Sequence, residues 1–542
     1  MELEKDEKAQ PHIDERSPGN SSLDINGLVN ASGHVQEIDR SWGIWSICSL
    51  ALISDNAWAA GAGSIVLALY NGGGPGVMHG LIVATFFYCF IGTSLAELSS
   101  AIPSSANVYH WASVTPGPKY GRVCSWFAGW WNCIAWIFGC ASNSLFAANA
   151  VVAMWSVYHP AYVPQRWHIF MCYLEIIWID NAIVCFGQKR IAQFANVSGV
   201  ACLTLFVVCT LTVAIMPSQT GYGYASNSFV WGDFQNLTGW SSNGLVFAMG
   251  MLNGAYTVGT TDAACHLCEE IPKPRVNIPK GIAAQLLAAF STAFIFYTAV
   301  LYGVTSLDDV FASNITSLPL AAMFQQATRS NAGTMALLVL YFFDILITIP
   351  GAWVTAGRML WVLGRDNATP FPNFVGEVST RWRNPFNAQI ICCCAATVLG
   401  LIYIGSATAF NAFVACFSLF TTISYATAIL PHLLTGRKYV KPGPFYMKGA
   451  LGYVVMGIAC AYIIVFNVIY MFPYTNPVTD PQLMNWTSVM FAGITSLLVI
   501  GYFWKRSRGY VGPRVVMDAK DNVMEGVIGL DKEIQARARQ AR

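Results

Sequence analysis

Charged residues are scarce in this sequence. Asp, Glu, Lys and Arg make up 11% of its 542 residues, whereas 55% are hydrophobic, and the mean hydropathy is +0.48. A soluble domain carries roughly 25% charged residues, so the composition excludes a water-soluble globular protein. We expect a lipid bilayer as the surroundings of the chain and no nucleic acid as a partner.

Long polar stretches are also missing from most of the chain. Runs of about 20 nearly uncharged apolar residues recur instead, and this is the length that an α-helix needs to cross a bilayer. Twelve such runs are predicted as transmembrane helices: 42–70, 77–101, 123–155, 167–186, 191–216, 244–266, 282–305, 333–362, 386–404, 408–434, 449–472 and 487–504. The predicted fold class is an all-α polytopic membrane protein.

Positive charge is nearly absent from one side of the predicted membrane. If the N-terminus lies in the cytosol, Arg166 and Arg329 are the only two of the 30 Lys and Arg residues in outer segments. The positive-inside rule favours this orientation. Because the number of helices is even, both termini are expected in the cytosol.

The two ends of the chain lack apolar runs. Residues 1–41 are polar and residues 506–542 are charged, so we expect two cytosolic tails of little order and no cleavable signal peptide. The predicted membrane domain covers residues 42–505.

Cysteines and sequons add little to this topology. No cysteine falls in a predicted outer loop, which favours buried free thiols over disulfides for all 16 of them. N-glycosylation sequons begin at Asn236, Asn314 and Asn485 in predicted outer loops, but others lie on the cytosolic side. The sequons therefore do not decide the orientation.

One stretch looks like a metal or redox centre. Residues 261–272 read TDAACHLCEEIP, in which Cys265 and Cys268 bracket His266. A cysteine zinc site needs a second ligand pair, and a thioredoxin-type motif needs a soluble α/β unit. The sequence offers neither, because its other cysteine cluster (392–394) is contiguous within one predicted helix. We therefore predict no metal and no cofactor, and assign the cysteine pair to helix packing.

The residues around this stretch carry a different signal. In NGAYTVGTTDAACHLCEEIPKPRVNIPKGI (253–282), an acidic residue, two small residues and His-x-x-Glu-Glu precede Pro-x-x-x-Ile-Pro. This order and spacing resembles the sixth-helix signature of the amino acid–polyamine–organocation transporter superfamily. The stretch IGTSLAELSSAIPSSANVYHWAS (91–113) is similar to the superfamily's second-helix pattern. It has Ala106–Asn107 where the pattern has two glycines, and we expect this change to remove their left-handed backbone freedom.

Details of the sequence are most similar to the fungal choline and γ-aminobutyrate permease branch of that superfamily. The similar segments are RWHIF (166–170), SLAELSSA (94–101) and GRDNATPFP (364–372). The resemblance covers about residues 42–505 and implies a LeuT-type fold. This fold has two inverted repeats of five helices, here followed by two extra helices, and helices one and six unwind in mid-membrane.

Two segments of the sequence fit paired helix breaks. NAWAAGAGSIV (56–66) and NGAYTVGTTD (253–262) each place an Asn and an aromatic residue before small residues. Small and hydroxyl residues lower the cost of leaving helical geometry, and freed backbone groups attract ions. Alternatively, the small residues let two helices pack closely. The predicted substrate-binding residues are Asn56, Trp58, Gly61, Ala62, Gly63, Ser64, Asn253, Tyr256, Gly259 and Thr260.

Acidic residues inside the membrane form the second group of candidates, because they are costly there. Asp55 precedes the first break and Asp262 follows the second. Handling of substrate or proton charge and hydrogen bonding between helices are equally open for these two residues. For Glu97, Glu269 and Glu270 we expect a cytosolic gate, held through Lys or Arg of neighbouring loops.

These features and the resemblance predict a secondary active transporter, not an enzyme. The expected substrate is a small amine or amino acid such as choline or γ-aminobutyrate, moved by alternating access. The resemblance implies a proton as the coupling ion and a fungal plasma membrane as the location. An exporter of a pathway-specific metabolite and a non-transporting nutrient sensor with a permease fold are the alternatives.

The substrate classes differ in the contacts that they need. A quaternary ammonium is held by aromatic faces and a nearby acid, whereas an amino acid would place its carboxylate on freed amides of helix one. The aromatic candidates are Trp58, Tyr256, Trp130, Trp131 and Trp136. Aromatic residues also gather at membrane interfaces, so their number does not select a substrate.

Overall fold

A computed structural model describes residues 49, 52–187, 190–313, 315, 317–406, 409–480 and 484–513. The predicted N-terminal tail (1–41) lies outside these residues. The predicted C-terminal tail is described only as far as residue 513, and the sequon at Asn314 is also outside.

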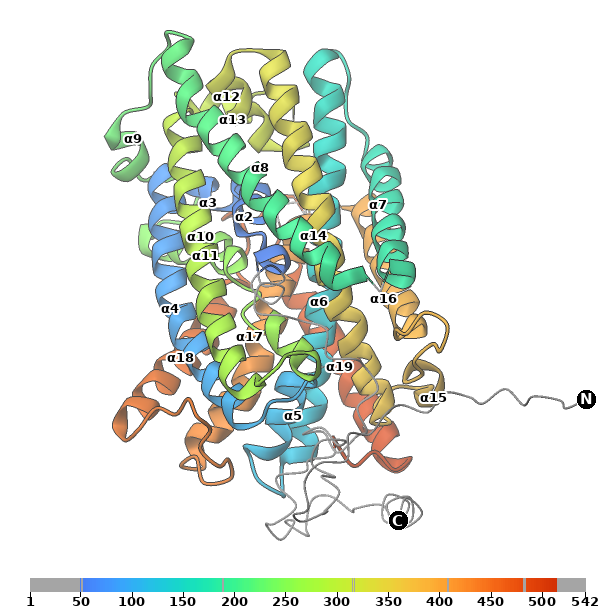
Figure 1. Ribbon diagram of the computed structural model, residues 1–542. Coiled ribbons are helices and arrows are strands. Elements are labelled where there is room, and N and C mark those ends of the chain that lie inside the picture. Colours follow the sequence, from blue (N-terminus) through green and yellow to red (C-terminus); the bar gives the residue numbers. More distant parts are fainter. Residues whose placement is uncertain are drawn as a thin grey trace, which may run out of the picture.

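The described chain folds into one bundle of long helices with short helices at both ends (Figure 1). Within the described residues, 11 helices are long and apolar enough to cross a membrane. The first of these spans, Leu52–Tyr70, contains α2 (Ala57–Gly63) and α3 (Val66–Tyr70). The others are α4 (Gly73–Ala101), α6 (Gly121–Tyr158), α7 (Arg166–Gly187), α8 (Ile191–Gln219), α11 (Pro274–Tyr302), α14 (Asn331–Arg365), α16 (Phe386–Gly405), α17 (Ala409–Leu434), α18 (Ala450–Ile469) and α19 (Thr487–Ser507).

The predicted sixth span is interrupted. Its first part is α10 (Asn243–Thr257), which has 15 residues, and its second part is the 3₁₀ helix η3 (Ala263–Glu270). Neither part reaches the ~20 residues that a continuous crossing needs. The interrupted sixth segment and the 11 candidate spans account for the 12 predicted helices, and the all-α membrane fold is confirmed.

The short elements lie at the two ends of the bundle. Helices α9 (Asn227–Trp231), α12 (Leu307–Phe311) and α13 (Pro319–Thr328) lie at or toward one end, and α5 (Asn107–Val114) and α15 (Pro372–Val375) lie toward the other (Figure 1). Two short strands, β1 (Asn71–Gly72) and β2 (Gln235–Asn236), pair antiparallel.

Helix packing follows the inverted repeat that the resemblance implies. If the first five spans are matched in order to the second five, α4 corresponds to α11, α6 to α14 and α7 to α16, and each of these helices packs against its counterpart. Contacts between helices that are not counterparts also come in symmetric pairs. Helix α17 of the second repeat packs on α6 of the first, and α8 of the first repeat packs on α14 of the second. In the same way α10 packs on α4 as α2 packs on α11. The segments α2 and α10 that open the two repeats therefore lie side by side in the interior.

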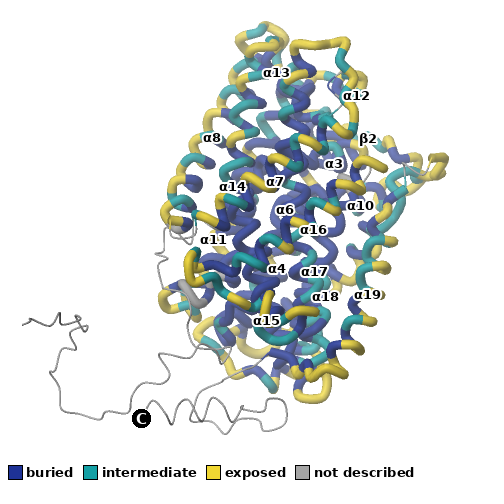
Figure 2. Tube along the Cα trace, turned by 90° about the vertical axis from the view of Figure 1, so that its right-hand side faces the viewer, coloured by how far each residue is buried: buried dark blue, intermediate teal, exposed yellow. Residues whose placement is uncertain are grey.

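Burial separates the inner helices from the outer ones. Figure 2 shows buried residues along the axis of the bundle and exposed residues on its outside and ends. Most of α17 is buried, whereas α19 is mostly exposed. The exposed side chains of α19 include Val489, Leu497 and Ile500, and apolar side chains on the outside of a membrane helix face lipid.

Candidate functional site

Helix one breaks on both sides of its small residues. Asn56 adopts a left-handed backbone (φ 38°, ψ 47°) just before α2, and its Nδ2 donates to Thr348 Oγ1 at 2.9 Å. A second interruption falls at Ser64 and Ile65, between α2 and α3. Both interruptions fall within the segment 56–66, which was predicted to hold the break, and residues 61–63 between them are helical.

The glycines of α2 are required by close packing. A Cβ added to Gly61 would overlap the Tyr297 hydroxyl and Thr257 Oγ1, and one added to Gly63 would lie 2.7 Å from the Tyr341 hydroxyl. These positions fit the alternative in which small residues let helices approach each other. Neither glycine lines a cavity described below.

Helix six opens where the sequence indicates. α10 ends at Thr257, and Gly259 and Thr260 have no helical structure. Gln285 Nε2 on α11 donates to the Thr260 carbonyl oxygen at 2.6 Å and to its Oγ1 at 2.7 Å. Thr260 Oγ1 in turn donates to Asp55 Oδ1 at 2.6 Å. These bonds supply partners for freed backbone groups, which a helix break inside a membrane requires, and they connect the two breaks.

Asn253 fastens α10 to α2. Its Nδ2 donates to the Gly61 carbonyl oxygen at 2.8 Å and to Ser64 Oγ at 2.9 Å. Asn253 and Ser64 are buried and line neither cavity. These two side chains therefore connect α10 to the end of α2.

A first, narrow cavity lies between α2, α6, α10, α14 and α17. Its aromatic wall consists of Trp136, Tyr256 and Phe417. The ring centroid of Phe417 lies 5.4 Å from that of Tyr256 and 6.0 Å from that of Trp136, in edge-on arrangements. The Tyr256 hydroxyl is 2.7 Å from Ser142 Oγ, which fixes the Tyr256 ring.

The polar lining of this cavity is dominated by one carboxylate. Asp55 lines the cavity, and its Oδ2 has no hydrogen-bond partner within the described residues. Ser54 Oγ and Trp136 Nε1 line the same cavity and also lack partners there. No Lys, Arg or His is among the described lining residues.

A second narrow cavity lies on the other side of α2 against α8 and α11. Asp55 lines both cavities, and Asn56, Trp58 and Cys202 line only the second. The Trp58 ring packs edge-on against Phe296, with 4.9 Å between the centroids. Trp58 therefore lies outside the first cavity, where Trp136 and Tyr256 supply the rings instead.

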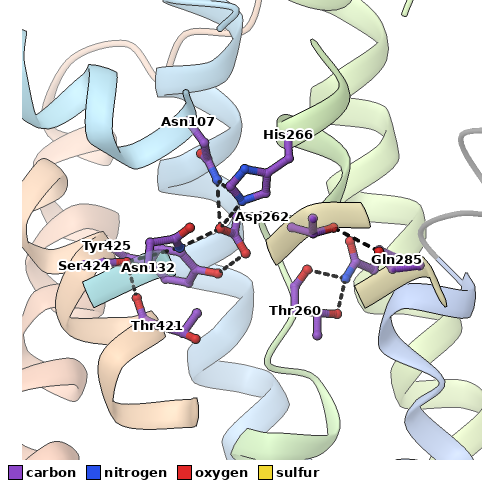
Figure 3. Close-up of polar contacts among 11 residues, drawn as sticks. Asn107, Asn132, Thr260, Asp262, His266, Gln285, Thr421, Ser424 and Tyr425 are labelled. Carbon is purple, nitrogen blue, oxygen red and sulfur yellow. Dashed lines mark hydrogen bonds and ion pairs between the residues drawn. The ribbon is translucent and has the colours of Figure 1, made fainter. Parts of the chain in front are cut away.

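Asp262 is the centre of a hydrogen-bonded cluster (Figure 3). Its Oδ1 accepts from the Tyr425 hydroxyl at 2.6 Å. Its Oδ2 accepts from Nδ2 of Asn107 and Nδ2 of Asn132, both at 2.8 Å, and lies 3.0 Å from His266 Nε2. The carboxylate is fully buried and joins the η3 segment to α5, α6 and α17, which is the arrangement expected for hydrogen bonding between helices.

Asn107 explains how the chain replaces a glycine of the superfamily pattern. Its φ is +50°, so the left-handed backbone is kept, and our expectation that the change removes it is wrong. Asn adopts this conformation more readily than other residues with a side chain. The substitution also adds the amide that donates to Asp262.

We expect Asp262→Asn to lower uptake at least about tenfold, because an amide cannot accept from all the donors that surround it. Each buried donor left without a partner costs roughly 1–3 kcal/mol, and 1.4 kcal/mol is a factor of ten. Uptake and the amount of protein at the membrane should be measured together, with the exposed Asp308→Asn as the control. Normal uptake by Asp262→Asn would contradict a role of the cluster in transport.

Glu97 ties the end of α4 to the segment between α17 and α18. It forms an ion pair with Arg437, and its Oε2 accepts from the backbone N–H of Met447 at 2.9 Å. His432 Nε2 lies 3.7 Å from Glu97 Oε1, and all of these groups are buried. The partner is an Arg of a neighbouring loop, as predicted, and the gating role remains a prediction. The side chains of Glu269 and Glu270 lie outside the described residues.

The cysteine pair lies in η3 beside this cluster. Cys265 and Cys268 are buried, and in the described part of the chain no group of three or more His, Cys, Asp or Glu side chains is placed to hold a metal ion. We expect joint replacement of both cysteines by alanine to leave more than about half of wild-type uptake, since buried cysteines behave as small apolar residues. Complete loss of uptake with normal trafficking would favour a metal site.

Some residues predicted for the substrate site lie away from the first cavity, and some residues that line this cavity were not predicted from the sequence. Trp131 Nε1 donates to Thr495 Oγ1 at 3.2 Å, so this ring faces α19, and Trp130 packs beside Trp126. The predicted substrate-binding residues that line neither cavity are Gly61, Ala62, Gly63, Ser64, Asn253 and Gly259. The lining residues that the sequence did not suggest are Ser54, Ala60, Gly139, Asn143, Ala352 and Phe417.

Comparison with known proteins agrees with this architecture. Residues 43–495 match the model of a family described as amino acid permease. A choline transporter of Saccharomyces cerevisiae is 28% identical, over 92% of this chain and 86% of that protein. The GABA-specific permease of the same yeast is 23% identical, over 92% of this chain and 87% of that protein. Its 7-keto 8-aminopelargonic acid transporter is 24% identical, over 86% of this chain and 92% of that protein.

The family match covers most of the chain, and the relatives are transporters of small amines and amino acids. The interrupted segments α2 and α10, the paired helix contacts and the multi-pass membrane fold are those of such a transporter. This chain therefore belongs to the amino acid permease family, in the fungal branch of the amino acid–polyamine–organocation superfamily.

Proposed function

We propose that this chain is a secondary active transporter of a small organic cation such as choline. The substrate binds in the first cavity and is moved by alternating access together with a proton. The observation that carries the proposal is Asp55 Oδ2, a carboxylate oxygen that borders an aromatic-lined cavity and has no partner among the described residues.

The charge of the cavity favours a cation. A buried carboxylate without a counter-ion is costly inside a membrane, and a bound cation removes this cost. The rings of Trp136, Tyr256 and Phe417 stand around the same space, and an organic cation over an aromatic face gains roughly 0.5–2 kcal/mol. A substrate carboxylate would meet the negative charge of Asp55, and the described lining offers no basic side chain to offset it.

The hydrogen-bond donors of the cavity suit a cation that carries a hydroxyl group. Ser54 Oγ and Trp136 Nε1 have no partner in the described chain. A quaternary ammonium group has no lone pair to accept a hydrogen bond, so the oxygen of a hydroxyl on its short chain is the atom that these donors can bind. Choline has this combination, and the similarity to a yeast choline transporter supports the same substrate class.

The closed cavity fits one state of an alternating-access cycle. Asp55, Trp136 and Phe417 are buried, and the cavity has room for little more than water, so its walls must move apart to admit a substrate. The Asp262 cluster and the Glu97–Arg437 ion pair hold together the end of the bundle that contains α5. We assign this end to the cytosol, in keeping with the positive-inside rule, and the protein to the plasma membrane.

The proposal is tested by uptake in permease-deficient yeast that express this chain. Labelled choline, γ-aminobutyrate, neutral and basic amino acids and polyamines are supplied separately, with and without a protonophore. Choline should accumulate, and the protonophore should abolish its accumulation. Uptake of an amino acid but not of choline would overturn the substrate assignment, and no uptake with protein at the cell surface would favour an exporter or a sensor.

A further inference from the structure

A second buried acid lies outside the first cavity. Asp344 on α14 is fully buried, and neither of its carboxylate oxygens has a hydrogen-bond partner of normal geometry within the described residues. It lines neither of the two cavities. An acid without such a partner in the interior of a membrane protein is costly, and its place relative to the helix breaks then decides whether it is a candidate functional residue.

Asp344 stands opposite the first break of helix one. One turn before it on α14, the Tyr341 hydroxyl donates to the Ala59 carbonyl oxygen at 3.1 Å. One turn after it, Thr348 Oγ1 accepts from Asn56 Nδ2 at 2.9 Å. These two bonds hold α14 against the left-handed residue that interrupts helix one, and Asp344 lies between them on α14.

The groups around Asp344 offer it no counter-charge. Asn56 and Cys202 lie beside the carboxylate, and the thiols of Cys202 and Cys209 on α8 and the Tyr341 hydroxyl are the titratable groups that interact with it electrostatically. Asp55 directly precedes Asn56 in the chain. No basic side chain is among these neighbours.

A proton satisfies this site better than a metal ion. Hard metal cations take about six oxygen ligands, whereas Thr348 Oγ1 is engaged by Asn56 Nδ2 and Asn56 Oδ1 faces the Cys202 thiol at 3.6 Å. In the described residues no cluster of three or more His, Cys, Asp or Glu side chains is placed to bind a metal. A single proton neutralises the carboxylate without further ligands.

We propose that Asp344 is the binding site of the coupling proton, separate from Asp55, which neutralises the substrate. This inference rests on the proposed function. The proton comes from the outer solution, is carried on an Asp344 carboxylate oxygen while the cavity is enclosed, and is released to the cytosolic water. Asp55 binds the organic cation and Asp344 binds the proton, so both can cross together without competing for one carboxylate.

The test uses purified full-length protein in liposomes, with potassium and valinomycin holding the membrane potential at zero. Two activities are measured for each protein: exchange of labelled choline, and choline accumulation driven by a pH difference of one unit. One pH unit is a tenfold difference in proton concentration, so coupling to one proton predicts about tenfold accumulation by the wild type. Asp344→Asn should keep choline exchange but lose accumulation, so the ratio of choline inside to choline outside should fall to about one.

Two further variants make the result specific. Asp180→Asn is the matched control, because Asp180 on α7 is also fully buried with both oxygens unpartnered in the described structure, and we expect it to behave as wild type. Asp344→Glu restores a group that can carry a proton, so it should recover accumulation at least in part.

The outcomes separate this inference from the proposed function. Absence of choline exchange by the wild type would contradict the proposed function itself. Wild-type exchange with full pH-driven accumulation by Asp344→Asn would overturn the role of Asp344 alone. Loss of exchange in Asp344→Asn while the variant keeps wild-type thermal stability would place Asp344 in substrate binding, and would also overturn the inference.

Discussion

Replacement of Asp55 by asparagine is expected to abolish choline uptake and to weaken choline binding at least about 30-fold. Removal of one partner of a buried charge pair typically costs about 2–5 kcal/mol, and 2 kcal/mol corresponds to roughly 30-fold in affinity. The effect should be large because Asp55 is the single acidic side chain among the described lining of the first cavity. Uptake of labelled choline and its affinity for purified protein are the two measurements.

The control for this variant is Asp180→Asn, which neutralises a buried acid on α7 that lines neither cavity. We expect it to bind choline with wild-type affinity. A second comparison is Thr260→Val, which removes the hydrogen bond to Asp55 Oδ1 but keeps the carboxylate, and should weaken binding less than Asp55→Asn. Equal affinity of wild type and Asp55→Asn would show that the cation binds elsewhere.

Replacement of Gly61 by leucine is expected to eliminate transport while protein still reaches the membrane. Even the Cβ would overlap the hydroxyls of Tyr297 and Thr257, so α2 has to move away from α10 and α11. Such overpacking costs typically 1–3 kcal/mol, which a large bundle tolerates, but it displaces the segment that carries Asp55. Uptake should be compared with the amount of protein at the cell surface.

A matched control lies on α18. Gly457 has no atom within 4 Å of the position where a Cβ would stand, so Gly457→Leu should transport normally. A suppressor test is also available, because Gly61→Ala combined with Tyr297→Phe and Thr257→Ala removes the overlapping atoms. If Gly61→Leu transports at the wild-type rate, the close packing of α2 is not needed for function.

The membrane fold could be predicted because the bilayer imposes a simple rule on the sequence. Each crossing needs about 20 apolar residues with their backbone groups bonded internally, and the runs at 123–155 and 333–362 appear as α6 and α14 with ends shifted by a few residues. The opening in helix six was also predictable, since Gly259 and Thr260 interrupt an apolar run before Asp262.

The position of the break in helix one could not be read from composition. Glycine permits both a helix break and a close helix contact, and only the neighbours of Gly61 show that close contact applies there. One of the two interruptions is at Asn56, where a side-chain bond to Thr348, 292 positions away, accompanies the left-handed backbone. A contact at such a distance in sequence leaves no local pattern.

The aromatic wall of the first cavity also could not be predicted from the sequence. The sequence does not distinguish among Trp130, Trp131 and Trp136. Their directions around α6 place only Trp136 in the first cavity. Phe417 lies in the apolar α17 and has no sequence feature that distinguishes it from neighbouring phenylalanines. Asp55 and Asp262 illustrate the point for acids, because the number of donors around each carboxylate depends on helices from distant parts of the chain.

The most direct test of cation recognition compares choline with 3,3-dimethylbutan-1-ol, its neutral isostere, on purified full-length protein. The two molecules have nearly the same shape and the same hydroxyl group, so a difference in affinity reports the charge. Titration calorimetry should give at least about 30-fold tighter binding of choline to the wild type, and a difference much reduced in Asp55→Asn. Equal binding of both molecules to the wild type would contradict recognition of a cation by Asp55 and the surrounding rings.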